Sequence, residues 1–259
     1  MEKLSERQPL PCVGEESARL KPARSKTFSR AYFKEAAALI KNVKILAFAA
    51  VICALRIAVK SLSVPIAPGV YLSFDCYVNA VGAMVYGPIF ALLVGAVSDT
   101  LGAVLFPKGA YFFPFIAVEM LSGFIFALFL WRKKLTAPRL LLAKFTVNFL
   151  CNIVLNSAIQ KWYYALFVTD KVYYMINGVR IVKNLAIFPL EAVLICVLLN
   201  ALLPGLKSLG YADKSQEGIA LEKKELLLCG AFAALSVAIV LFYVFFLRDF
   251  VAAHNIKLF

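Results

Sequence analysis

Long apolar segments, separated by short polar and basic ones, dominate the sequence from residue 43 onward. A helix needs about 20 apolar residues to cross a bilayer. The predicted spans are 43–62, 72–86, 87–106, 111–131, 140–164, 181–203 and 226–247. The second span is short and polar, and Gly87-Pro88 predicts a tight turn between it and the third. This pattern predicts an all-α polytopic membrane protein.

The composition agrees with this interpretation. The chain has 259 residues, of which 62% are hydrophobic, and its mean hydropathy is +0.82. The formal net charge of +13 does not indicate a nucleic acid partner, because much of the excess flanks the apolar spans, as membrane topology requires. Six cysteines occur singly and the only histidine is His254, so we expect neither a metal site nor a cofactor.

The distribution of Lys and Arg predicts the topology. Eight basic residues lie between Arg19 and Lys44, four between Arg132 and Arg139, and four between Lys207 and Lys224. These segments hold sixteen basic residues and the alternate segments hold seven in total, so we expect a cytoplasmic N-terminus in the cell membrane. The expected organisation is a basic, disordered tail (1–42), a six-helix domain (43–204), a cytoplasmic linker (205–225) and an additional C-terminal transmembrane helix with a short tail (226–259).

One segment combines a carboxylate, a cation and aromatic residues. It reads GPIFALLVGAVSDTLGAVLFPKGAYFFPF from Gly87, with Asp99 inside the apolar run and Lys108, Tyr111 and Phe112 after it. A carboxylate in hydrocarbon is costly and is usually retained for a function. The segment therefore indicates a site for a flat, partly charged solute near one membrane face.

Four polar residues share one face of the fifth predicted span. They are Asn148, Asn152, Asn156 and Gln160, at four-residue spacing. Such a face either lines an internal cavity or forms hydrogen bonds between helices. We interpret Asn156 and Gln160, in the outer half, as functional and Asn148 as structural.

Ionisable residues also occur in the other spans. Arg56 is expected to face a cavity, pair with an acid or extend to the interface. Arg180 and Lys183 share a face at the start of the sixth span, where they either bind a ligand's carboxylates or reach lipid head groups. The carboxylates Asp75, Asp99, Glu119 and Glu191 cannot all face lipid, so some must pair with these cations, meet the asparagines or bind a ligand.

Ala50, Ala54 and Ala58 repeat at four-residue spacing in the first span. Small residues at this spacing admit a second helix closely. On the sequence pattern alone, packing within the chain is the better interpretation.

Motifs for catalysis are missing from the sequence. There is no GxxxxGK[ST] phosphate loop, no HExxH and no GxSxG. We therefore expect no enzyme, and the chain is typical of a solute-binding membrane subunit or a secondary carrier.

Three segments carry a resemblance to a known family. The chain resembles the substrate-binding S component of energy-coupling-factor (ECF) vitamin transporters, especially the folate-specific subfamily. The resemblance lies in the segment from Gly87, in LNSAIQKWYYALF and in VRIVKNLAIFPLEAVL. The resemblance covers about residues 43–204. It implies a six-helix bundle, a vitamin site on the outer side, and three partners: a transmembrane coupling subunit and two cytoplasmic ATPases. It also implies that Ala50, Ala54 and Ala58 dock on the coupling subunit.

Folate would make three demands on such a site. Aromatic faces such as Tyr111, Phe112 and Trp162 would sandwich its flat rings. A carboxylate (Asp75, Asp99 or Glu119) would accept from the pterin amino group, and Arg180 and Lys183 would bind the glutamate tail.

The chain departs from the resemblance in its additional span, its long basic N-terminus and the segment YLSFDCYVNA. Asp75 in that segment leaves open another flat micronutrient, such as another vitamin or a modified nucleobase. A solitary secondary carrier is the remaining alternative.

Overall fold

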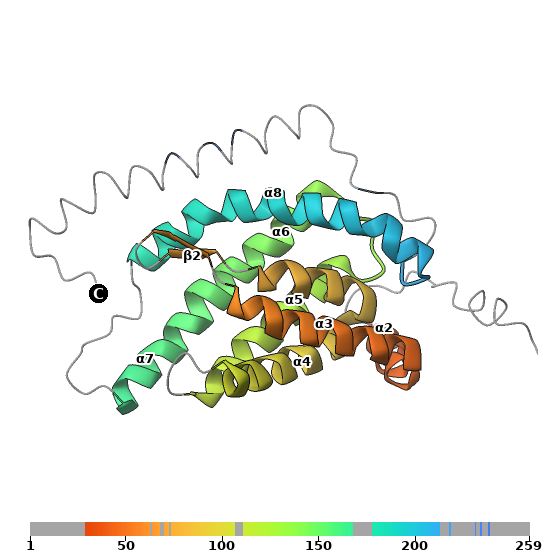
Figure 1. Cartoon of the computed structure of the whole chain (residues 1–259), viewed down its shortest axis with the longest axis horizontal. Helices are drawn as coiled ribbons and strands as arrows, with labels where there is room; N and C mark the ends of the chain where they lie inside the picture. The colour runs from red at the N-terminus through yellow and green to blue at the C-terminus, as the bar shows by residue number, and fades with distance from the viewer. Residues whose placement is uncertain are drawn as a thin grey trace, which may run out of the picture.

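The structure is a computed structural model that describes residues 29–62, 64–67, 70–72, 74–106, 111–167 and 178–212, together with 218, 231, 234 and 238. The described part is a bundle of helices with one short hairpin (Figure 1). Its elements are α2 (Arg30–Ala38), η1 (Leu39–Lys41), α3 (Val43–Ser61), β1 (Val64–Ala67), β2 (Val70–Leu72), α4 (Asp75–Leu105), η2 (Phe113–Phe115), α5 (Ile116–Leu130), α6 (Ala137–Val147), the π-helical η3 (Asn148–Leu155), α7 (Asn156–Phe167) and α8 (Gly178–Ser208).

The helix α4 reverses its direction at Gly87. In a straight helix Asp75 and Asp99 would be about 36 Å apart. Instead Asp75 is paired with Arg56 and Asp99 with Lys60, two residues one turn apart on α3. Gly87 has φ 78° and ψ −177°, which breaks the helix there. The predicted turn between the second and third spans is confirmed, and α4 supplies two antiparallel helices.

Six helical segments therefore form the bundle: α3, the two halves of α4, α5, the continuous run from α6 to α7, and α8 (Figure 1). In the described residues, four helices are long and apolar enough to cross a membrane, or five if the bent pair of α2–η1 and α3 is counted as one span. The prediction of an all-α polytopic membrane protein is confirmed. The hairpin of β1 and β2, which pairs Val64 with Leu72, was not predicted.

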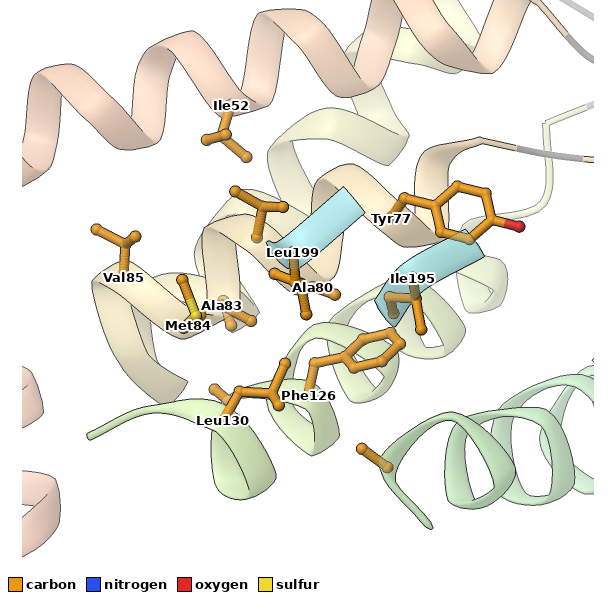
Figure 2. Packing of buried hydrophobic residues seen from close by; sticks show 14 of the residues in the cluster. Ile52, Tyr77, Ala80, Ala83, Met84, Val85, Phe126, Leu130, Ile195 and Leu199 are labelled. Atoms are coloured by element: carbon orange, nitrogen blue, oxygen red, sulfur yellow. The ribbon is translucent and has the colours of Figure 1, made fainter. Parts of the chain in front are cut away.

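Apolar side chains from several helices form the core of the bundle. Figure 2 shows Ile52 of α3, Ala80 of α4, Phe126 of α5 and Leu199 of α8 directed toward one another. The close approach of α4 to α5 depends on Gly95, because a Cβ there would lie 2.9 Å from the carbonyl oxygen of Glu119. Small residues at such crossings allow helices to pack closely without a hydrophobic driving force.

The six-helix domain begins at Val43 as predicted, but helical structure also precedes it and its last helix is longer than expected. The predicted disordered tail, 1–42, is wrong for residues 30–41, which form α2 and η1, because Tyr32 and Ala36 of α2 are buried against Trp131. The last helix continues beyond residue 204 to Ser208. The predicted seventh span, 226–247, and most of the linker lie outside the described residues; 231, 234 and 238 are described as helical.

We expect the substitution Gly87→Ala to destabilise the bundle by about 2 kcal/mol. An L-residue in this backbone conformation costs roughly 1–2 kcal/mol, and the new methyl group would lie 2.8 Å from the Trp131 ring. Thermal unfolding in detergent measures the change. The matched control is Gly205→Ala in α8, where nothing lies within 4 Å of the added Cβ. An unchanged melting temperature for Gly87→Ala would contradict the role given to this turn.

Candidate functional site

Five ionised side chains form one connected cluster, here called the Arg56 network. Arg56 Nε and Nη2 donate to Oδ1 and Oδ2 of Asp75 at 2.9 and 2.8 Å, and Nη2 also donates to Glu119 at 2.6 Å. Lys60 lies 2.9 Å from Asp99 and 3.1 Å from the other carboxylate oxygen of Glu119. Two cations of α3 thus face three carboxylates, one from each half of α4 and one from α5.

The helix positions explain why these residues meet. Arg56 and Lys60 are four residues apart, so they lie on one face of α3. Asp75 is the first residue of α4 and Glu119 lies in the first turn of α5. The Arg56 side chain has no solvent exposure, and its atom Nη1 has no hydrogen-bond partner in the described part of the chain. The network therefore places a buried guanidinium where three helix ends converge.

The three predicted carboxylates are not equivalent. Both oxygens of Asp75 accept from Arg56, and those of Glu119 are divided between Arg56 and Lys60. Asp99 uses only Oδ1, toward Lys60, among the residues that the structure describes, and its side chain is 17% exposed. Of the three, Asp99 has the most capacity to accept a further hydrogen bond.

A second charged cluster surrounds Lys144. Its ammonium lies 2.9 Å from Glu191 of α8 and 3.4 Å from the Cys76 sulfur, and the side chain is only 2% exposed. Asn148 donates to Glu191 at 3.4 Å and Asn152 donates to Asn148 at 3.1 Å. This agrees with the structural interpretation of Asn148. Lys144 and Lys60 were missed in the sequence, although a lone charged residue in an apolar span is the same signal that identified Asp99.

Aromatic side chains gather beyond the Arg56 network. The ring of Phe112 lies 5.3 Å from Trp162, 5.5 Å from Tyr163 and 5.9 Å from Phe167. It also lies 6.0 Å from Phe115, one helical turn before Glu119. Phe112 and Trp162, both named as candidate binding residues, therefore lie side by side, and both belong to the same end of the bundle as the network.

The structure gives fewer contacts for the remaining predicted site residues. Tyr111 is exposed and lies beside Phe112 in the chain, while Asn156 and Gln160 are partly buried on α7. Arg180 and Lys183 belong to the first two turns of α8, but the structure does not describe their side chains. Lys108 is outside the described residues.

The stripe of Ala50, Ala54 and Ala58 is exposed along α3. The opposite face of this helix carries the buried residues Ile52 and Arg56. Packing of the stripe within the chain, which the sequence pattern favoured, is therefore wrong for the described structure.

The fold and these clusters define a polytopic helical membrane protein with a paired-charge centre next to an aromatic cluster. A model of the family described as "ECF-type riboflavin transporter, S component" matches residues 40–204, and the chain belongs to this family. The resemblance to ECF S components is confirmed.

Two curated relatives are folate transporters named FolT. The protein from Clostridium novyi (strain NT) is 32% identical over 157 residues, which is 60% of this chain and 88% of the relative. The protein from Leuconostoc mesenteroides is 29% identical over 133 residues, or 50% and 70% of the two chains. A crystal structure of FolT bound with folic acid is similar with a TM-score of 0.50 and 26% identity, covering 57% of this chain and 87% of that one. Within the family, the chain is FolT-like.

We predict that Lys144→Met destabilises the protein by about 3 kcal/mol, because Glu191 is left buried without its cation. The melting temperature in detergent should fall by roughly 6–12 °C. The double variant Lys144→Met/Glu191→Gln should recover most of this loss, since it removes both charges. Lys161→Met on the exposed face of α7 is the control. A double variant as unstable as the single one would refute the buried pair.

Proposed function

We propose that this protein captures folate or a related pterin from outside the cell and delivers it through a coupling subunit driven by two partner ATPases. The observation that carries the proposal is the likeness to FolT proteins over most of their length, including a crystal structure of FolT bound with folic acid. On this proposal the N-terminus is cytoplasmic and the chain performs no catalysis itself.

The geometry supports a ligand with a flat, donor-bearing ring. Phe112, Trp162 and Tyr163 offer aromatic faces and edges at one end of the bundle. Asp99, whose second carboxylate oxygen has no partner among the described residues, is the best acceptor for a pterin amino group, whereas Asp75 and Glu119 act chiefly by holding Arg56 and Lys60. Tyr111, Lys108, Asn156 and Gln160 complete the proposed binding surface.

Arg180 and Lys183 are proposed to bind the glutamate tail. Both belong to the beginning of α8, where a bidentate guanidinium and an ammonium suit two carboxylates. This assignment separates the two ends of the ligand: carboxylate and aromatic groups for the pterin, cations for the tail.

A second candidate ligand is riboflavin, because the matching family model is named for it. Riboflavin also has a flat ring but lacks a glutamate tail, so it makes no use of Arg180. Mass spectrometry of the compound that copurifies with the protein, followed by titration with folate, pteroic acid and riboflavin, distinguishes the two. Copurified riboflavin with no response to folate would overturn the proposal.

The same titration tests the binding roles proposed for Asp99 and Arg180. Asp99→Asn should weaken folate and pteroic acid alike, by about tenfold or more, because a charge-assisted hydrogen bond contributes about 1.5–3 kcal/mol. Arg180→Ala should weaken folate but leave pteroic acid, which lacks the glutamate, nearly unchanged. Equal losses for the two ligands in Arg180→Ala, or folate affinity unchanged in it, would exclude the tail assignment.

The exposed stripe of Ala50, Ala54 and Ala58 is proposed as the face that docks on the coupling subunit. We predict that Ala54→Leu reduces copurification of the coupling subunit and ATPases by about tenfold or more, since overpacking costs about 1–3 kcal/mol. Ligand affinity should stay unchanged, because the stripe lies on the face of α3 opposite Arg56. Ala201→Leu, at an exposed position of α8, is the matched control. Normal complex formation by Ala54→Leu would exclude this face.

A further inference from the structure

The helix α2 is fixed to one end of the bundle. The ring of Tyr32 lies 4.7 Å from that of Trp131, and its hydroxyl donates to the carbonyl oxygen of Ala127 at 3.4 Å. Tyr32, Ala36 and Trp131 are nearly or fully buried. Since Trp131 also packs against Gly87, α2 contacts the end of the bundle opposite the Arg56 network.

An ion pair secures the same contact. Arg132 pairs with Glu35 of α2, and its guanidinium lies 4.6 Å from the centre of the Trp131 ring. Arg132 has φ 54°, an unfavourable conformation for a residue with a side chain. These two contacts hold the loop after α5 against α2, so the orientation of α2 is set by the bundle.

That orientation places α2 across the direction of α3. The segment Arg30–Lys41 makes an angle of 86° with Val43–Ser61. Asn42 fixes the bend, because its side chain accepts hydrogen bonds from the backbone N–H groups of Lys44 and Ile45 and so forms the N-cap of α3. With the axis of α3 along the membrane normal, this angle would bring α2 roughly parallel to the membrane surface.

The outward face of α2 and the start of α3 is basic. Arg30, Lys34, Lys41 and Lys44 are exposed, and in the described part of the chain none of the four has an acidic partner. The only acid of α2 and η1, Glu35, is already paired with Arg132. The sequence adds Arg19, Lys21, Arg24 and Lys26 just before this segment.

We propose that this basic face, formed by Arg30, Lys34, Lys41 and Lys44, binds the head groups of anionic phospholipids. Charge complementarity favours this occupant, since each Lys or Arg near an anionic membrane surface contributes about 1 kcal/mol. Exposed Ala31, Ala37 and Ile40 give the same segment the apolar contacts that a helix at the head-group boundary needs. The inference is independent of which vitamin is bound.

Native mass spectrometry of the full chain in neutral detergent tests the proposal, with phosphatidylglycerol and phosphatidylcholine as probes. Wild-type protein should bind phosphatidylglycerol more tightly than phosphatidylcholine. In the triple variant Arg30→Gln/Lys34→Gln/Lys41→Gln this preference should fall by about fivefold for each cation removed. Raising the salt should weaken binding of the wild type, since exposed charges are screened.

The matched pair of single variants is Lys34→Gln and Lys161→Gln, both at exposed helical positions. Only the first should reduce binding of phosphatidylglycerol, and this pair decides the matter if the triple variant does not fold. Equal binding of the two lipids, or equal losses in the two single variants, would overturn the proposal. It would also be overturned if the triple variant bound phosphatidylglycerol normally but lost its copurifying protein subunits, because the face would then serve an acidic protein surface.

Discussion

The bidentate contact between Arg56 and Asp75, extended to Glu119, is the interaction on which the rest of the bundle depends. A guanidinium without solvent exposure must have acidic partners, so the starts of α4 and α5 are held at the level of Arg56 on α3. Lys60, one turn further along, then requires Asp99, and Asp99 can reach it only if α4 reverses at Gly87. The charges of the interior therefore determine the path of the apolar helices around them.

The two charged clusters connect different sets of helices. The Arg56 network joins α3, α4 and α5, and the Lys144 cluster joins α4, α6, η3 and α8. Asp75 and Cys76, adjacent residues at the start of α4, connect them. In the interior of a membrane protein, where lipid is as apolar as the helices, such polar contacts and close packing replace the hydrophobic effect between helices.

The sequence predicts the number of helices better than the partners of their charges. Apolar run lengths and Gly87-Pro88 are local signals, and they were sufficient for the six-helix bundle. Pairing with an acid was one of three alternatives that the sequence left open for Arg56, and the choice of Asp75 and Glu119 as its partners depends on the reversal of α4. The helix α2 was missed because its few apolar residues become significant only when Trp131, a hundred residues later, lies beside them.

The helix α3 carries two different surfaces, and its periodicity keeps them apart. Ile52 and Arg56 follow Ala50 and Ala54 by two residues, which turns them about 200° around the helix axis. Arg56 is buried among carboxylates while Ala50, Ala54 and Ala58 are exposed. Because Arg56 is bonded to two other helices, α3 cannot rotate about its own axis without breaking buried ion pairs. A partner that docks on the alanine face must therefore act on α3 together with the helices it is bonded to.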